Sequence, residues 1–155
     1  MSHLITTSPF LPLPDGIVIA SVHPTASRLV VQVACCRPSA ACPLCQQPSE
    51  RVHGAYMRTV ADLPCAGRRV ILALRVRKFV CGTSTCPRKI FTERLLDLVQ
   101  SYAHMTNRLR EALQMLGFAT CGEVSERVAP KLGMQVSGRP APCLTFPSRH
   151  TQDSS

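Results

Sequence analysis

Four cysteines in two close pairs are the residues of this sequence best suited to chemistry. Cys42 and Cys45 enclose the segment CPLC, and Cys81 and Cys86 enclose CGTSTC. Two cysteines separated by two residues can turn both sulfurs inward from one tight turn, and a structural zinc ion takes four such ligands in a tetrahedron. The wider second pair still falls within the spacing of zinc knuckles. The pattern therefore predicts one zinc ion, held by Cys42, Cys45, Cys81 and Cys86 in a zinc ribbon.

Two other interpretations of these cysteines remain open. CPLC also has the spacing of a thioredoxin-type redox pair, although such a pair precedes a helix in a βαβ unit and this one lies between β-rich runs. A further alternative is that the four thiols are buried cysteines without a ligand. The chain has nine cysteines. In a reducing compartment that odd number favours metal ligands and buried thiols over a disulfide framework.

Composition indicates where the chain acts and what it binds. The N-terminal segment lacks the basic start and apolar run of a signal peptide, and no apolar stretch is long enough to span a membrane. We therefore expect a cytoplasmic protein. The formal net charge is +9, which favours a polyanionic partner such as nucleic acid.

The positive charge is concentrated in the middle of the chain. Between residues 51 and 94 there are ten Lys and Arg against two Asp and Glu, a local net charge of +8 (10 minus 2). Arginine suits phosphate because its planar fork donates two hydrogen bonds at once. For any single arginine a solvated surface position is the simpler explanation, but the cluster as a whole favours nucleic acid. The residues predicted to contact DNA phosphates are Arg75, Arg77, Lys78, Arg88 and Lys89.

The elements that must position these residues are β-rich in the first two-thirds of the chain. Residues 17–36 contain two apolar runs separated by HPTAS, which predicts a hairpin. Residues 68–81 form a run that alternates up to Arg77, with Val70, Leu72, Leu74 and Val76 on one side and more basic residues on the other, which predicts a long strand with one buried face. The alternation breaks at Lys78 and Phe79, so we expect a bulge or the end of the strand there.

The remaining third is predicted to be helical and then disordered. Helices are expected from Thr92 to about residue 104, from an N-cap at Thr106 to Gly117, and over 121–133, where Pro130 should introduce a kink. Residues 138–155 are rich in proline and have no periodicity, so they predict a disordered tail. The fold class is α+β, in four regions: a hairpin region 1–41, a zinc ribbon 42–91, a helical region 92–137 and the tail.

Residues 42–96 resemble the N-terminal zinc-finger segment of the ISL-three family of bacterial insertion-sequence transposases. The cysteine pairs, RVHGAYMR, ADLPCAGR, LRVRKFVC and CPRKIFTERL stand in the order and spacing of that family. A weaker resemblance continues through MTNRLREALQMLGF and GEVSERVAPKLGMQVS, which are similar to the helix-turn-helix that follows the finger. The resemblance implies zinc on the four cysteines and DNA at the element ends as the partner.

The sequence departs from this family after Ser137. The family continues with a recognition helix and a catalytic domain of DDE type, in which acidic residues hold the metal ions. Here the prolines of SGRPAPC disfavour a recognition helix, so the helix-turn-helix is only partial. The resemblance therefore implies a truncated, non-catalytic, zinc-dependent DNA-binding fragment of a transposase, with a second copy or an intact transposase as further partners. The alternative is a zinc-ribbon module that binds protein or RNA.

Overall fold

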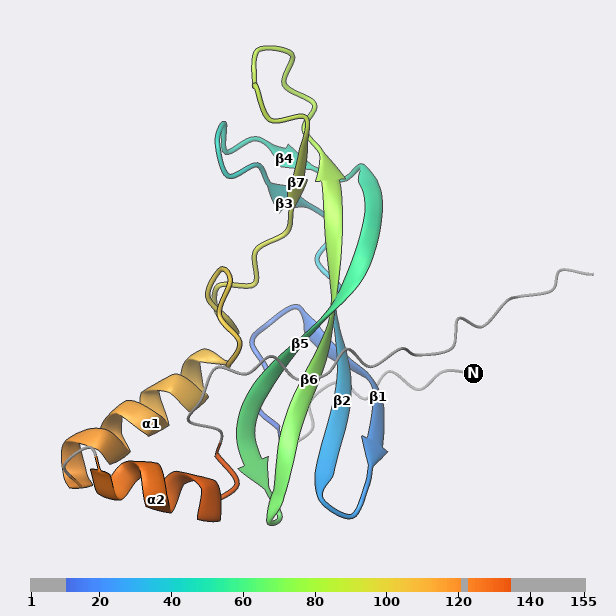
Figure 1. The fold of residues 1–155 in the computed structure, drawn as a ribbon. Coiled ribbons are helices and arrows are strands. Elements are labelled where there is room, and N and C mark those ends of the chain that lie inside the picture. Colours follow the sequence, from blue (N-terminus) through green and yellow to red (C-terminus); the bar gives the residue numbers. More distant parts are fainter. Residues whose placement is uncertain (1–10, 121–122, 135–155) are drawn as a thin grey trace, which may run out of the picture.

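A mixed five-stranded sheet forms the body of the protein (Figure 1). The computed structural model describes residues 11–120 and 123–134. The strands lie in the order β1, β2, β6, β5, and β7 pairs with the end of β6. Only the β2–β6 pair is parallel within this sheet. The strands are β1 (Ile17–Pro24), β2 (Arg28–Cys35), β5 (Val52–Cys65), β6 (Arg68–Val80) and β7 (Ile90–Thr92), and a separate small sheet pairs β3 (Ala40–Ala41) with β4 (Pro48–Ser49).

The hairpin predicted over residues 17–36 is present as β1 and β2. The amide of Thr25 donates to the carbonyl of Arg28 at 2.8 Å and closes the turn. The second strand of this hairpin also pairs in parallel with β6, from Arg28 to Ala34. Parallel neighbours need a long connection, and here that connection contains the first cysteine pair and β5. One sheet therefore joins residues from the regions 1–41 and 42–91.

Strand β5 was not predicted from the sequence. It pairs antiparallel with β6 along nearly its whole length, from Val52 opposite Phe79 to Cys65 opposite Arg68. The two strands are joined through Ala66 and Gly67, with φ values of 49° and 72°. Two successive positive φ angles are typical of a type I′ hairpin turn. Such turns usually contain Asn-Gly or Asp-Gly, so the Ala-Gly pair gave little signal.

The alternation along β6 was predicted correctly. Its even-numbered residues from Val70 to Val76 are buried in the main hydrophobic cluster, together with Val31 and Val33 from β2 and Val60 from β5. Because opposite residues in neighbouring strands share a face, these strands present one continuous apolar surface. The β6 residues on this surface are Val70, Leu72, Leu74 and Val76.

The irregularity predicted at Lys78 and Phe79 is present as a bulge, because Val52 of β5 pairs with Phe79 and Gly54 pairs with Lys78. The extra residue belongs to β5, and β6 itself does not end there but continues to Val80. Phe79 is fully buried, but in a second cluster that contains Phe91 and the metal-binding cysteines. The odd-numbered position of Phe79 places it on the face opposite the main cluster. The sequence alternation changes there because β6 passes from one core to the other.

The helix predicted from Thr92 to residue 104 is wrong. Thr92 ends β7, and the amide of Glu93 continues the pairing by donating to the carbonyl of Arg77 at 3.0 Å. After one turn at Leu95, the chain crosses the main cluster and buries Leu98 there. The apolar residues whose spacing suggested a helix therefore cover the sheet in a non-helical segment. The β-pairing at residues 92–93 takes the place of the expected N-cap.

Two helices follow this segment, α1 (Asn107–Thr120) and α2 (Glu123–Lys131), and they contact each other. The predicted N-cap is confirmed, because the hydroxyl of Thr106 accepts from the amide of Leu109 at 3.3 Å. The first helix continues past Gly117, contrary to the prediction, whereas Gly133 does follow the second with a φ of 81°. Neither helix in the described ranges is long and apolar enough to cross a membrane. The predicted tail, 138–155, lies outside the described residues.

A buried ion pair joins α1 to β5. The carboxylate of Asp62 has no exposed side-chain surface and accepts from the hydroxyl of Thr106 at 2.7 Å. The guanidinium of Arg108 donates to both oxygens of this carboxylate, from Nε at 2.7 Å and from Nη2, and also to the carbonyl of Pro12 at 2.7 Å. This network fixes the start of α1 against the sheet.

Replacing Arg108 should destabilise the fold strongly, because removal of one partner leaves a buried charge without compensation. We expect Arg108→Met to lower the free energy of unfolding by about 3 kcal/mol, measured by denaturant titration. Arg37→Met is the matched control: its partner Asp97 is largely exposed, and such surface pairs contribute under about 1 kcal/mol. Equal losses in the two variants would contradict the structural role of the buried pair.

Candidate metal centre

The first cysteine pair lies on a tight turn between β3 and β4. The amide of Gln46 donates to the carbonyl of Cys42, and the amide of Cys42 donates to the carbonyl of Gln47, both at 2.9 Å. Gln46 has a φ of 61°, in the left-handed region, so the chain reverses immediately after Cys45. The two-residue pairing of β3 with β4 holds the ends of this turn together.

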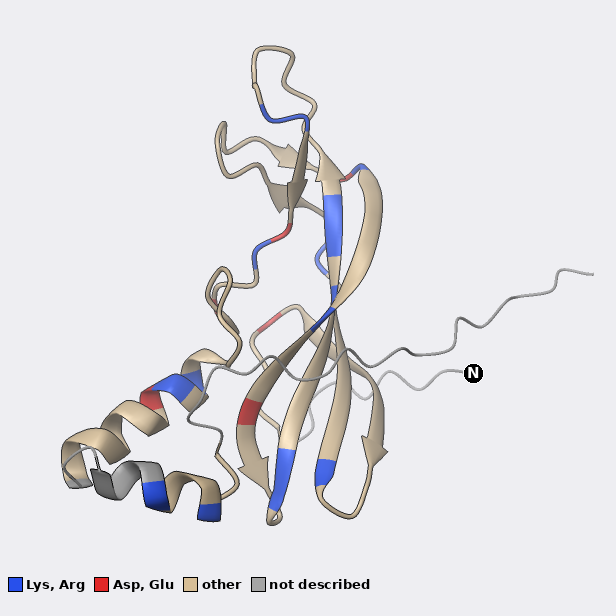
Figure 2. Cartoon of the chain, viewed as in Figure 1, with Lys and Arg blue, Asp and Glu red and all other residues tan. Residues whose placement is uncertain are grey.

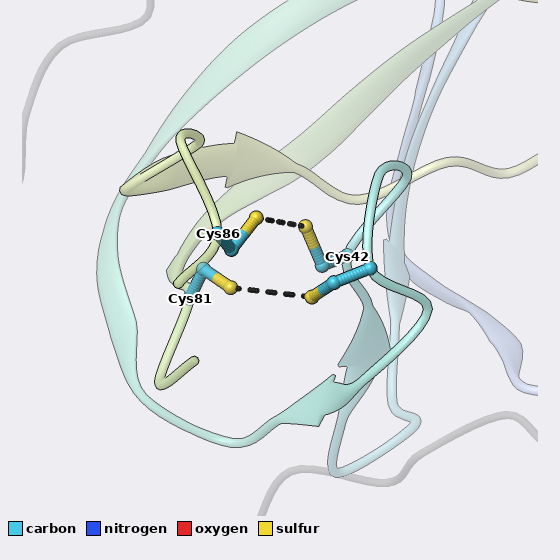
Figure 3. Close-up of side chains that lie close together, drawn as sticks. Cys42, Cys81 and Cys86 are labelled. Atoms are coloured by element: carbon cyan, nitrogen blue, oxygen red, sulfur yellow. Dashed lines mark hydrogen bonds between the residues drawn. The ribbon is translucent and has the colours of Figure 1, made fainter. Parts of the chain in front are cut away.

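The second pair lies on the loop between β6 and β7. The amide of Cys81 donates to the carbonyl of Lys89 at 2.8 Å, and the amide of Cys86 donates to the carbonyl of Thr83 at 3.2 Å. The ammonium group of Lys89 donates to the carbonyls of Ser84 and Cys86, at 3.2 and 3.1 Å. These bonds close the loop and direct its two sulfurs towards the first pair (Figure 3).

The four sulfurs have the spacing of a zinc tetrahedron. All lie within 4.8 Å of one another, with 3.9 Å from Cys42 Sγ to Cys86 Sγ and 3.6 Å from Cys45 Sγ to Cys81 Sγ. Zinc–sulfur bonds of about 2.3 Å in a tetrahedron give sulfur–sulfur edges of about 3.8 Å. Because three of the four cysteines are buried and the other is half-buried, the site is closed, as structural zinc sites are. The donor set and its size fit Zn²⁺, as predicted.

This arrangement argues against a redox pair. The hydrogen bonds between thiols join one knuckle to the other, Cys42 to Cys86 and Cys45 to Cys81, and all four are free thiols. CPLC also lies between two short strands, not in front of a helix.

The surroundings of the thiols lower the pKa of two of the cysteines and raise the pKa of a third. The hydrogen bond from the Thr83 hydroxyl lowers the pKa of Cys45 to about 6, and the backbone amide of Cys45 lowers the pKa of Cys42. Burial, in contrast, raises the pKa of Cys86 to about 11. Zinc binds thiolates, so the ion must displace a proton from Cys86 at neutral pH.

The metal centre is attached to the sheet through the end of β6. The rings of Phe79 and Phe91 stack with centroids 5.8 Å apart and form one cluster with the cysteines. The hydroxyl of Ser49 donates to the carbonyl of Val80 at 2.6 Å, and the amide of Val80 donates to the carbonyl of Arg51 at 2.9 Å. Both knuckles are therefore tied to the same strand end.

Arg77, one of the five residues predicted to contact DNA, is held inside the protein. Its guanidinium donates to both carboxylate oxygens of Glu93, with a shortest distance of 2.7 Å, and to the carbonyl of Arg37 at 2.9 Å. The side chain of Arg77 is 13% exposed and that of Glu93 is 3% exposed. The guanidinium also lies over the ring of Phe79, 5.0 Å from its centroid. We therefore assign Arg77 a structural role and omit it from the proposed DNA surface.

Lys78 and Arg88 lie together in a groove between the second knuckle, β5 and the segment that follows β7. The groove has a volume of about 550 Å³. Figure 2 shows basic segments on the zinc-proximal part of β6 and just after β7. We call this hollow the basic groove; its lining includes the cations Lys78, Arg88, Arg58 and Arg94 and the tyrosines Tyr56 and Tyr102, together with Phe91 and His104.

The other two predicted residues lie outside the basic groove. Arg75 is exposed on β6, and its odd-numbered position puts it on the opposite face of the strand from Lys78. Lys89 is exposed but bonded to carbonyls of its own loop. The five basic residues thus do not form one continuous surface.

Sequence reasoning did not identify four residues of the basic groove. Arg58 and Arg94 were counted only as part of the general positive charge, and β5, which contains Arg58 and Tyr56, was not predicted. Tyr102 was assigned to a helix that the structure does not have. The aromatic residues close to basic ones were the available signal.

We expect the purified protein to bind one zinc ion and Cys81→Ser to lose it, because serine supplies no thiolate. Structural zinc contributes on the order of 10 kcal/mol to small domains. Chelation should therefore open the backbone amides of residues 40–50 and 80–92 to hydrogen exchange, while β2 and the first half of β6 stay protected. Native mass spectrometry and hydrogen exchange measure the two effects.

The matched control is Cys36→Ser, because Cys36 is an exposed cysteine outside the cluster. It should retain full zinc. Full zinc content in both Cys81→Ser and Cys86→Ser would contradict the ligand set.

Comparison with known proteins agrees with this geometry. A family model described as the zinc-finger of transposase IS204/IS1001/IS1096/IS1165 matches residues 38–87, which is about a third of the chain. The match spans both cysteine pairs, the short strand β3 before the first pair and the strands β4 to β6 between the pairs. No curated protein and no solved structure matches the chain significantly. Residues 38–87 therefore resemble the zinc finger of this transposase family, in agreement with the ISL-three resemblance of the sequence.

Proposed function

We propose that this chain is a zinc-dependent DNA-binding module of a DDE-type insertion-sequence transposase and that it binds the ends of the element in the cytoplasm. The observation that carries this function is the basic groove beside a transposase-type zinc finger. DNA binding would take place alongside an intact transposase or a second copy of the chain.

The charges of the groove support a nucleic-acid partner. Lys78 and Arg88 are both exposed, and Arg94 lines the same hollow. Within residues 11–120 and 123–134, no acidic side chain lines it. Glu93, the acidic residue next to Arg94 in the sequence, is neutralised by its pair with Arg77. The groove therefore presents positive charge without a competing carboxylate, as phosphate binding requires.

In the described part of the chain, the arrangement of the acidic residues does not support cleavage or joining of DNA strands. Cleavage and joining of DNA need carboxylates clustered around two divalent ions. Among residues 11–120 and 123–134, the only group of three or more candidate ligands is the four-cysteine cluster. The two buried carboxylates, Asp62 and Glu93, are each paired with an arginine. We therefore propose a binding role without catalysis.

Replacing Lys78 and Arg88 together by alanine should weaken binding to duplex DNA, because each supplies positive charge next to the zinc finger. For each phosphate that the variant no longer neutralises, the slope of log affinity against log salt should decrease by about 0.9. If each of the two side chains neutralises one phosphate, the slope should decrease by about 1.8 in total. Fluorescence anisotropy in a salt series measures this slope.

The matched control is the double variant Arg68→Ala and Arg69→Ala, which removes the same charge from exposed positions at the opposite end of β6. Its salt slope should stay close to that of the unaltered protein. Equal changes in both double variants would indicate general charge attraction. Binding to a protein or RNA partner in preference to DNA, with little dependence on salt, would favour the alternative function.

We also expect the zinc-loaded chain to shift DNA without cutting it. Incubation with element-end duplex and Mg²⁺ or Mn²⁺ should give a bound complex on native gels but neither nicks nor joined strands on denaturing gels. An active transposase incubated with the same DNA is the positive control. Metal-dependent cleavage that disappears on replacement of an acidic residue of this chain would contradict the proposal.

A further inference from the structure

Two tyrosines give the basic groove a chemistry beyond phosphate attraction. Tyr56 lies on β5 and is 41% exposed, and Tyr102 lies on the segment after β7 and is 92% exposed. Neither ring is needed to fill the hydrophobic clusters. Exposed aromatic rings next to cations are the arrangement with which proteins hold unpaired bases, because the rings stack on the bases while the cations contact the backbone.

Building on the DNA-binding function above, we propose that the basic groove binds an unpaired DNA strand, with bases stacked on Tyr102 and Tyr56 and phosphates on Lys78 and Arg88. The groove would thus distinguish single-stranded from duplex DNA, which simple charge attraction does not.

The first support is the pairing of a cation with one of the rings. The ammonium group of Lys78 lies over the ring of Tyr56, 5.5 Å from its centroid. This contact orients the ring and keeps the charge at the groove wall. A base that stacks on Tyr56 would therefore have its phosphate within reach of a cation that is already in place.

The second support is the backbone at Tyr102. Tyr102 has a φ of 63°, in the left-handed region that tyrosine rarely adopts. Residues retained in such a conformation are often found at binding sites, because stability alone would favour glycine there. The ring is almost fully exposed, so burial of its apolar surface does not offset the cost of this backbone conformation. A ligand that stacks on it is a physical reason to keep a tyrosine at this position.

The segment that presents Tyr102 is held firmly in place. The guanidinium of Arg58 donates to the carbonyl of Ala103. Further along β5, the amide of Ala61 donates to the carbonyl of His104, and the carbonyl of Ala61 accepts from the amide of Thr106, both at 2.9 Å. Arg58 is therefore a positioning residue for the loop, and Tyr102 is presented on a rigid edge of the sheet.

The size of the groove favours a single strand. Its volume of about 550 Å³ lies in the range of clefts that enclose small ligands. About one or two nucleotides of an unpaired strand fit such a hollow. A double helix has its bases stacked on each other and can meet the groove only through its backbone. The tyrosines would then have no base to stack on.

The test uses the full zinc-loaded chain and fluorescence anisotropy with labelled oligonucleotides of about 12 nucleotides, within the site sizes of single-strand binders. The probes are single-stranded DNA of mixed sequence, its duplex and the corresponding single-stranded RNA. We expect Tyr102→Ala to weaken single-strand binding by about tenfold, as loss of one stacked base does, and to change duplex binding by less than about twofold. Tyr102→Phe should retain the affinity, because it keeps the ring.

Two further variants separate binding from folding. Tyr102→Gly should also weaken single-strand binding while leaving the Tm unchanged or raised, because glycine accepts the positive φ. Phe118→Ala is the matched control: it removes an aromatic ring that is 91% exposed on α1, outside the groove, and should leave all affinities unchanged. Zinc content and Tm are measured for every variant.

The outcomes distinguish this inference from the DNA-binding function. If Tyr102→Ala and Tyr56→Ala leave single-strand affinity within about twofold while Lys78→Ala still weakens duplex binding, the groove does not stack bases and the DNA-binding function stands. Equal losses on single strand and duplex would also overturn the inference. Tighter binding of the RNA than of the DNA strand would overturn the choice of DNA. If the unaltered protein binds no nucleic acid, the proposed function itself fails.

Discussion

The alternation of side chains along β6 is the constraint on which the rest of the structure depends. Its even-numbered residues from Val70 to Val76 are buried in the main cluster. Towards its end, Phe79 and then Cys81 are buried in the metal cluster. Successive residues of a strand point to opposite faces, so one strand serves two cores. The metal site is small and has few apolar residues of its own, and its position therefore depends on the end of this strand.

Buried ion pairs decide which basic residues remain available to a partner. Arg77 and Arg108 are each bonded to a carboxylate with at most 3% exposed side chain. Such pairs contribute little net stability relative to apolar residues, but removal of one partner is strongly destabilising. They therefore fix geometry: Arg77–Glu93 holds the segment after β7 against β6, and Arg108–Asp62 holds α1 against β5. Lys78, Arg88 and Arg94 line the basic groove instead, whereas other cations, such as Arg68 and Arg75, are exposed elsewhere on β6.

The basic groove depends on the metal because its walls come from different parts of the chain. Arg88 belongs to the knuckle loop, Tyr56 and Arg58 belong to β5, and Tyr102 lies on the segment that pairs with the edge of β5. Loss of zinc would release the knuckle loop and leave the tyrosines without the wall that faces them. If the groove binds DNA as proposed, that binding is expected to depend on zinc, although no residue of the groove is a zinc ligand.

The sequence by itself determined the features that depend on local spacing. The cysteine pairs indicated the candidate zinc ligands, period-two alternation indicated the buried face of β6, and Thr106 indicated the cap of α1. A knuckle, a pleat and a cap each involve only neighbouring residues. Tertiary structure decided the features that depend on distant partners. Pairing with Arg77 turned the residues around Glu93 from a predicted helix into an extended segment, and the same contact removed Arg77 from the surface. The basic groove brings Tyr56 and Tyr102 together from segments far apart in the chain, and no local pattern in the sequence encodes that proximity.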